Sequence, residues 1–188
     1  MYRVQTAATP RRLAIGFALA VTGSVLMAIS AKVAVPMVPI PITLQTLALP
    51  LLVLALGRNL AVASLLLYLS EGALGLPVFA SVAGLPGLLN HSAGYLWMYP
   101  IAAFVMGSLL ESGLRATWAG RWAAIFAGDA IVFAGGAGWL MAALHLNIAQ
   151  TLALGVTPFI IGDLLKITIA SALPSQAAKI AARFHLSG

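Results

Sequence analysis

The sequence of 188 residues contains no cysteine and only four acidic residues. Without cysteine the chain has no disulfides, no thiol nucleophile and no thiolate metal site. The three histidines, His91, His145 and His185, are scattered without ligand-like spacing, so we expect neither a metal nor another cofactor. The phosphate-binding motif Gly-x-x-x-x-Gly-Lys-Ser/Thr is also missing, so any ATP hydrolysis must belong to another chain.

Charged residues make up only 7% of the chain, whereas hydrophobic residues make up 62% and the mean hydropathy is +1.04. Soluble domains do not have this composition. The net charge of +6 would suggest nucleic acid as a partner of a soluble protein. In a membrane protein the positions of the basic residues matter more, so the lipid bilayer and not nucleic acid is the expected partner. We therefore predict an all-α polytopic protein with one integral membrane domain over residues 1–188.

Six hydrophobic segments predict six transmembrane helices, over residues 13–30, 43–56, 60–74, 95–110, 122–144 and 156–173. A spanning helix needs about 20 residues, so the second and third segments are short. Residues 57–59, Gly-Arg-Asn, separate those two. The first segment is longer than the apolar part of a secretion signal, and we expect it to stay as a helix.

An even number of spans places both termini on one side of the membrane. Eight basic residues then share that side: Arg3, Arg11, Arg12, Arg58, Arg115, Arg121, Lys179 and Arg183. The other side has only Lys32, and Lys166 lies within the membrane. Since basic residues favour the cytoplasmic side, both termini are predicted to be cytoplasmic.

Two connections on the outer side, residues 33–45 and 75–94, are apolar and rich in proline or glycine. Proline lacks an amide donor and disfavours helix before it, so the first connection is predicted to be extended. Apolar irregular backbone at membrane depth is tolerated where protein buries it or where it lines a cavity. Both connections lie where the sixth helix begins, which predicts an outward-facing pocket covered by two apolar loops.

Asp163 and Lys166 interrupt the apolar sixth segment, with Asp163 about two turns from its outer end. An ionised side chain at the centre of a membrane helix costs roughly 2.5–3.5 kcal/mol even on a mild scale, and it usually marks a substrate or ion path. The spacing i, i+3 places both side chains on one helix face. We expect them at the floor of the pocket; a purely structural ion pair is the alternative.

Several blocks, at residues 38–47, 67–69, 72–80, 94–96 and 162–167, resemble the BioY family. The most specific are Pro-Ile-Thr-Leu-Gln-Thr-Leu at 41–47 and Gly-Asp-Leu-Leu-Lys at 162–166. BioY proteins are the biotin-binding S components of energy-coupling factor (ECF) transporters. The resemblance runs from the first helix to the sixth, but Asn-His-Ser-Ala-Gly-Tyr at 90–95 replaces the family's Gly-Pro-Thr-Gly-Gly-Tyr type of block.

This resemblance implies a non-enzymatic, multi-pass subunit of the bacterial plasma membrane that captures biotin from outside. It also implies partnership with a transmembrane coupling subunit and ATPase subunits. Three alternatives stay open. They are an S component for another vitamin, a small proton-coupled secondary transporter, and an intramembrane aspartyl protease that uses Asp129 and Asp163.

The chemistry of biotin suggests further binding residues, because the ligand has a ureido head, an apolar ring and a carboxylate tail. Asp163 can accept from a ureido N–H, while Lys166 can contact the ligand or hold Asp163 ionised. Asn90, Gln45 and Thr43 offer amide and hydroxyl groups, and Phe79 and Tyr95 offer flat apolar surfaces. Each has a structural alternative: helix capping for Gln45 and Thr43, a turn for Asn90, and packing for the two aromatics.

Small residues form a stripe on the first helix, which comprises Gly16, Ala20, Ser24 and Ala28, with Ala14 and Ala18 beside it. Small side chains let another helix approach closely. The stripe is either a docking face for the coupling subunit or an internal packing face. Asp129, about two turns into the fifth segment, is interpreted as paired with a polar neighbour on another helix; a second functional carboxylate is the alternative.

Overall fold

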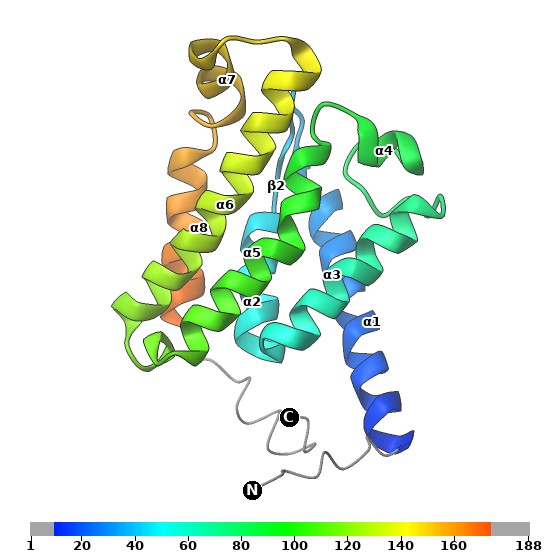
Figure 1. Ribbon diagram of the computed structural model, residues 1–188, viewed down its shortest axis with the longest axis vertical. Helices are drawn as coiled ribbons and strands as arrows, with labels where there is room; N and C mark the ends of the chain where they lie inside the picture. Colours follow the sequence, from blue (N-terminus) through cyan, green and yellow to red (C-terminus); the bar gives the residue numbers. More distant parts are fainter. Residues whose placement is uncertain (1–9, 174–188) are drawn as a thin grey trace, which may run out of the picture.

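The computed structural model describes residues 10–173, which form a helical bundle with a short hairpin near one end (Figure 1). Eight α-helices lie in this part of the chain: α1 (Pro10–Lys32), α2 (Gln45–Leu56), α3 (Arg58–Ala73), α4 (Leu85–Leu89), α5 (Ala93–Glu111), α6 (Trp118–Leu144), α7 (Ile148–Gly155) and α8 (Ile160–Ala172). The other elements are the 3-10 helix η1 (Leu114–Ala116) and the strands β1 (Ala34–Val35) and β2 (Ile42–Thr43). The mainly helical prediction is confirmed.

Each of the six predicted segments coincides with a helix, but the helices differ in length. Within residues 10–173, α1, α5 and α6 are long and apolar enough to cross a membrane, and α7 with α8 would add a fourth crossing, bent by 52°. The helices α2 and α3 have 12 and 16 residues, fewer than the roughly 20 that a straight crossing needs. Helix length alone therefore leaves the six-span count as a prediction.

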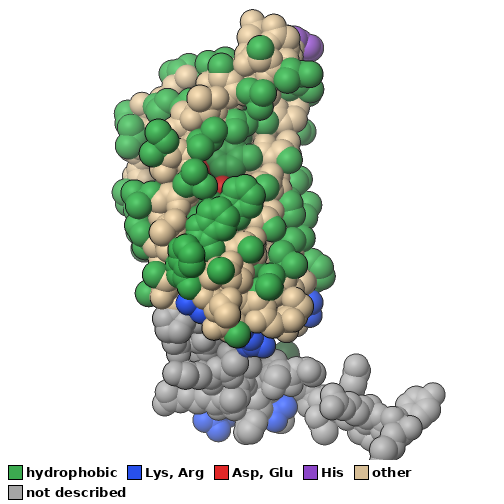
Figure 2. All heavy atoms as spheres, turned by 90° about the vertical axis from the view of Figure 1, so that its left-hand side faces the viewer, with side chains coloured by type: hydrophobic (Ala, Val, Ile, Leu, Met, Phe, Trp, Pro, Cys, Tyr) green, Lys and Arg blue, Asp and Glu red, His purple; other side chains and the backbone are tan. Residues whose placement is uncertain are grey.

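Basic side chains gather at one end of the bundle, where Figure 2 shows them below an apolar side face. Arg11 and Arg12 begin α1, Arg58 begins α3, and Arg115 and Arg121 lie in η1 and at the start of α6. These five positions match the predicted gathering of basic residues on one side of the membrane. Three of the basic residues counted above, Arg3, Lys179 and Arg183, lie outside the described residues, as does His185.

The outer loops take the irregular form that the prolines predict. Residues 33–44 form a small antiparallel hairpin in which Ala34 pairs with Thr43 and Val35 with Ile42. The second loop contains α4, a five-residue helix that the sequence did not predict. Figure 1 shows the hairpin and α4 at the same end of the bundle, opposite the basic end.

The predicted sixth segment, residues 156–173, begins too early, because its helix α8 starts only at Ile160. Turns at residues 156–159 separate α7 from α8, because Pro158 has no amide hydrogen and disfavours helical backbone at Thr157. Asp163 consequently lies in the first turn of α8, and the prediction that it lies two turns into a helix was wrong. A carboxylate in the first turn interacts favourably with the helix dipole, which offsets part of its burial.

Among the described helices, α5 and α6 share the most extensive contact, and glycines of α6 allow side chains of α5 to approach its backbone. A Cβ atom at Gly136 would lie 2.3 Å from the Tyr95 ring, and one at Gly128 would lie 2.3 Å from Met106. Because α6 has no side chain at these two glycines, Tyr95 and Met106 of α5 pack directly against its backbone. The contact with Gly136 fixes the Tyr95 ring at the pocket.

Candidate functional site

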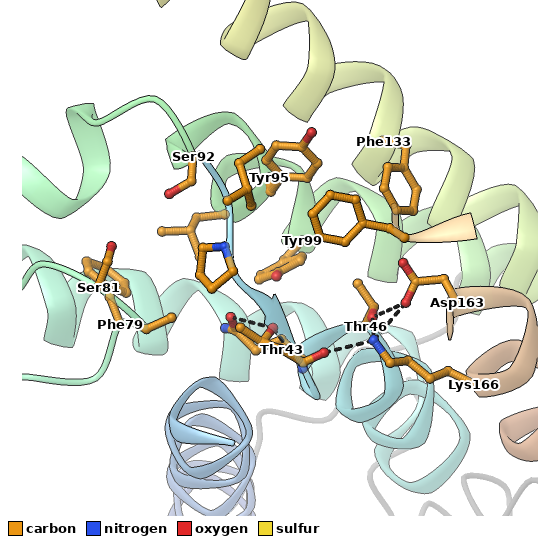
Figure 3. A pocket seen from close by; sticks show the side chains of 16 residues that line it. Thr43, Thr46, Phe79, Ser81, Ser92, Tyr95, Tyr99, Phe133, Asp163 and Lys166 are labelled. Carbon is orange, nitrogen blue, oxygen red and sulfur yellow. Dashed lines mark hydrogen bonds and ion pairs between the residues drawn. The ribbon is translucent and has the colours of Figure 1, made fainter. Parts of the chain in front are cut away.

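A pocket lies between the two outer loops and helices α2, α5, α6 and α8 (Figure 3). It encloses about 600 Å³, its open mouth included. Six of the seven predicted binding residues line it: Thr43, Gln45, Phe79, Tyr95, Asp163 and Lys166. Those that the sequence did not single out include Thr46, Ser81, Ser92, Tyr99, Phe133 and Phe159.

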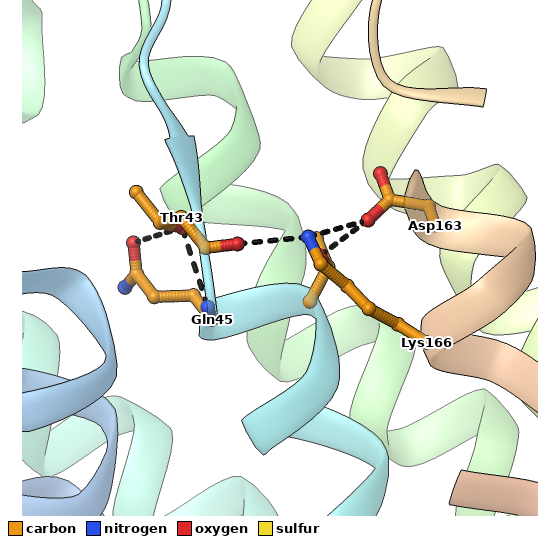
Figure 4. Close-up of polar contacts among 5 residues, drawn as sticks. Thr43, Gln45, Asp163 and Lys166 are labelled. Atoms are coloured by element: carbon orange, nitrogen blue, oxygen red, sulfur yellow. Dashed lines mark hydrogen bonds and ion pairs between the residues drawn. The ribbon is translucent and has the colours of Figure 1, made fainter. Parts of the chain in front are cut away.

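Lys166 directs its ammonium group to other protein atoms. Its Nζ lies 2.8 Å from Asp163 Oδ1, 2.9 Å from Thr46 Oγ1 and 2.8 Å from the Thr43 carbonyl oxygen. Figure 4 shows the ammonium between the start of α2 and the carboxylate on α8. An ammonium group has three N–H donors, so all three have acceptors here.

Asp163 is only 3% exposed, and its two oxygen atoms have different surroundings. Oδ1 accepts hydrogen bonds from Lys166 and, at 2.6 Å, from the Thr46 hydroxyl. Oδ2 is buried and has no hydrogen-bond partner among the described residues. A buried acceptor without a donor costs about 1–3 kcal/mol, and a donor from a bound ligand would remove this penalty.

Thr43 and Gln45 line the pocket at the start of α2, where the N-cap residue is Leu44 and no side-chain capping bond forms. The Gln45 amide donates to Thr43 Oγ1 at 3.3 Å, which is a local hydrogen bond at the start of α2. The Gln45 side chain, 2% exposed, also donates to the Tyr68 hydroxyl at 2.9 Å. These bonds hold both polar side chains in the pocket wall.

The two predicted aromatic residues are held in place by defined contacts. The Phe79 ring packs edge-on against Tyr68, with ring centroids 5.4 Å apart. The Tyr95 hydroxyl donates to the Gly155 carbonyl oxygen at 2.7 Å and so connects α5 to the end of α7. Phe133 and Phe159 extend the apolar wall, with centroids 5.9 Å apart. No sequence pattern marked these last two, since an aromatic residue in an apolar helix is typical of packing.

Asn90 is the predicted residue that the structure does not bring to the pocket lining. Its Oδ1 accepts from the Ser92 amide at 2.9 Å and from the Ser92 hydroxyl at 2.8 Å. A short amide side chain that bonds the backbone two residues on forms a turn of its own. The turn interpretation is therefore the one that the structure supports.

Asp129 does not have the polar partner that we expected. It is 7% exposed and forms no hydrogen bond or ion pair within residues 10–173. It lies one helical turn before Phe133 on α6. The expectation of a polar partner was therefore wrong within the described residues.

The small-residue stripe of α1 divides into two faces. Ala20 and Ser24 are buried, and the Ser24 hydroxyl donates to Glu71 of α3 at 2.9 Å. Gly16 and Ala28 are half-buried, whereas Ala14 and Ala18 are exposed. Residues four apart on a helix share a face, so Ala20 and Ser24 pack internally, and the docking prediction was wrong for these two.

The chain resembles known proteins over most of its length. Residues 4–183 match the model of the BioY family. A probable biotin transporter BioY of Pyrococcus horikoshii is 34% identical over 142 residues, which cover 75% of this chain and 82% of the relative. The biotin transporter BioY of Thermotoga maritima is 31% identical over 156 residues, which cover 82% and 90%.

The fold also resembles a solved structure. The crystal structure of the S-component for biotin from an ECF-type ABC transporter matches with a TM-score of 0.77. The match covers 97% of this chain and 96% of that one, at 22% sequence identity. The helical arrangement described above is thus that of a known transporter component.

Proposed function

The chain belongs to the BioY family, and we propose that it captures biotin for uptake as the substrate-binding subunit of an ECF-type transporter. It is a membrane transport subunit and not itself an enzyme. The proposal draws on the family match, the named relatives and the pocket at the outer end of the bundle.

The single observation that carries the assignment to this pocket is the unpaired Oδ2 atom of Asp163. The ureido head of biotin has two N–H donors, and one of them would donate a hydrogen bond to this buried oxygen atom. A hydrogen bond to an ionised acceptor contributes about 1.5–3 kcal/mol, more than a bond between neutral groups. Asp163 therefore fixes the orientation of the head in our proposal.

Lys166 acts on the ligand through Asp163. Because its three donors bond Asp163, Thr46 and the Thr43 carbonyl, Lys166 holds the Asp163 carboxylate in place beside the start of α2. This arrangement assigns Lys166 a positioning role.

The remaining walls suit the rest of the ligand. Phe79, Tyr95 and Phe133 offer apolar surfaces for the thioether ring. Figure 3 shows Ser81 and Ser92 at the end of the pocket away from Asp163. With the head at Asp163, the carboxylate tail extends toward these hydroxyl groups and the mouth.

We further propose six membrane crossings with both termini in the cytoplasm. In this arrangement α7 and α8 form one bent crossing, and the extended hairpin continues α2 toward the outer surface. The basic residues at one end of the bundle favour that end as the cytoplasmic one. The protein would then lie in the plasma membrane with its pocket open to the outside.

The expected partners are a transmembrane coupling subunit and the ATPase subunits that it connects. Of the small residues on α1, Ala14 and Ala18 remain accessible for docking, beside the exposed side chains of Leu13 and Phe17. In Figure 1 this half of α1 extends past the rest of the described bundle. A helix of the coupling subunit could approach this face closely because its side chains are small.

Titration calorimetry on the purified protein in detergent tests the function. The wild type should bind biotin, and Asp163→Asn should weaken binding by about 10- to 150-fold, which corresponds to the loss of about 1.5–3 kcal/mol from a hydrogen bond to a charged group. Asp129→Asn is the matched control, since it makes the same change in the same bundle outside the pocket lining and should leave the affinity unchanged. A folded wild type that does not bind biotin would refute the proposal.

Three alternatives make different predictions. An S component for another vitamin would bind that vitamin in competition assays and not biotin. A proton-coupled transporter would take up substrate in cells or vesicles without any ATPase. A protease dyad needs two carboxylates that share a proton, and the Lys166 ion pair to Asp163 argues against it.

A further inference from the structure

We propose that the hydroxyl group of Tyr99 donates a hydrogen bond to the carbonyl oxygen of the ureido head. Tyr99 would then be a specificity-determining residue that distinguishes a cyclic urea from head groups without an acceptor at this point. The inference rests on the proposed function, because it names a further contact at the same site.

Tyr99 is 4% exposed and lines the pocket, yet its hydroxyl group forms no hydrogen bond with any described residue. The two other buried tyrosines differ from it in this respect. The Tyr95 hydroxyl donates to the Gly155 carbonyl oxygen, and the Tyr68 hydroxyl accepts from Gln45. Unlike Asp163 Oδ2, the Tyr99 hydroxyl is not fully buried, so its O–H group is open to the pocket and can donate to a ligand there.

The position of Tyr99 fits this role. It lies one helical turn after Tyr95 on α5, and Figure 3 shows it between Tyr95 and Thr43, with Asp163 to one side. Tyr99 and Asp163 both line the pocket, and no hydrogen bond joins them. A small planar group that enters between them can contact both.

The two unpaired atoms match one edge of a cyclic urea. Along that edge an N–H donor adjoins the C=O acceptor, so recognition needs an acceptor beside a donor. Asp163 Oδ2 is the acceptor, and the Tyr99 hydroxyl is the donor. Lys166 is the other nearby donor, but its three hydrogens already have acceptors.

Affinities for biotin and for iminobiotin, in which an imino group replaces the ureido carbonyl, test the inference. At neutral pH the protonated imino head donates hydrogen bonds and offers Tyr99 no acceptor. Tyr99→Phe should weaken biotin binding by about 10-fold, the effect of one buried hydrogen bond, and change iminobiotin binding by less than about 2-fold. Tyr95→Phe is the matched control, because its hydroxyl bonds the protein, and it should shift both ligands by the same factor.

An equal shift of both ligands by Tyr99→Phe, or no shift of either, would overturn the Tyr99 contact and leave the biotin assignment intact. A wild type that fails to bind biotin would instead refute the proposed function, and the inference with it. If Tyr99→Phe does not fold, Tyr99→Leu also removes the hydroxyl and keeps the site filled. The same change in the ratio of the two affinities is then required.

Discussion

The imidazole of His91 donates from Nε2 to the carbonyl oxygen of Pro39, which joins the two outer loops that cover the pocket. Other long side chains hold loop carbonyls in the same way: Lys32 bonds Phe79 at 2.6 Å, Trp97 bonds Leu88 at 3.0 Å, and Trp139 bonds Asn90 at 2.8 Å. Among these bonds, only that of His91 links one loop to the other. The loops therefore cannot separate without breaking it.

Replacing His91 by alanine should speed the release of biotin. One hydrogen bond contributes about 1 kcal/mol, so the dissociation rate should rise about 5-fold, as measured by stopped-flow with a fluorescent biotin derivative. His145→Asn is the control, since His145 lies beyond α6 with a φ of 53°, a conformation that asparagine tolerates. Equal dissociation rates for wild type and His91→Ala would show that this bond does not hold the loops closed.

Removing the ammonium of Lys166 should harm stability and binding together. In Lys166→Met the buried carboxylate of Asp163 loses its ionic partner, and breaking a buried pair from one side costs about 3–5 kcal/mol. The double variant Asp163→Asn, Lys166→Met has no unpaired charge, so it should recover most of the thermal stability in detergent but not the affinity for biotin. If the double variant binds biotin as the wild type does, the ion pair is purely structural.

Phe79 depends on a glycine for its place in the pocket wall. A Cβ atom at Gly72 would lie 2.0 Å from the end of the Phe79 ring, so Gly72→Ala must move the ring and the loop that carries it. We expect biotin affinity to fall at least 10-fold, roughly the effect of losing one well-packed aromatic contact. Gly138→Ala is the matched control, because no atom lies within 4 Å of its added Cβ. Unchanged affinity in Gly72→Ala would mean that Phe79 does not contact the ligand.

Asp129→Asn should stabilise the protein. The wild-type carboxylate is buried without a hydrogen bond in the described part of the chain, and an amide of the same shape removes the penalty of a buried charge. Each kcal/mol gained should raise the unfolding temperature by about 2–4 °C for a chain of this size. A lower unfolding temperature would show instead that the charge of Asp129 stabilises its surroundings, Lys166 included.

The sequence was informative where a residue type permits only a few structural environments or backbone conformations. Charged side chains in an apolar segment predicted the pair Asp163–Lys166, and prolines predicted the extended course of residues 33–44. The sequence was less informative where the rotation of a helix about its axis decides which of its side chains line the pocket. Tyr99 and Phe133 line the pocket, and an apolar periodicity does not reveal which side chains of a buried helix do so.

Two errors had signals that were present but underused. Pro158 predicts a break before α8, which moves Asp163 from mid-helix to a first turn, where burial of its charge is less unfavourable. Asparagine followed two residues later by a polar residue is typical of a turn, and Asn90 forms one with Ser92. The sequence held no such signal that Asp129 would have no polar partner among the described residues.

The division of the α1 stripe leads to a test of partner docking. Ala18 is exposed and Ala20 is 7% exposed, so leucine at these two positions should act differently. Ala18→Leu should leave biotin binding and thermal stability unchanged, but it should weaken co-purification with a coupling subunit and lower uptake, because the added volume keeps a partner helix at a distance. Ala20→Leu should instead lower the stability of the isolated subunit by about 1–3 kcal/mol through overpacking against the bundle. If Ala18→Leu assembles and transports as the wild type does, the exposed face of α1 contacts lipid and the docking surface lies elsewhere.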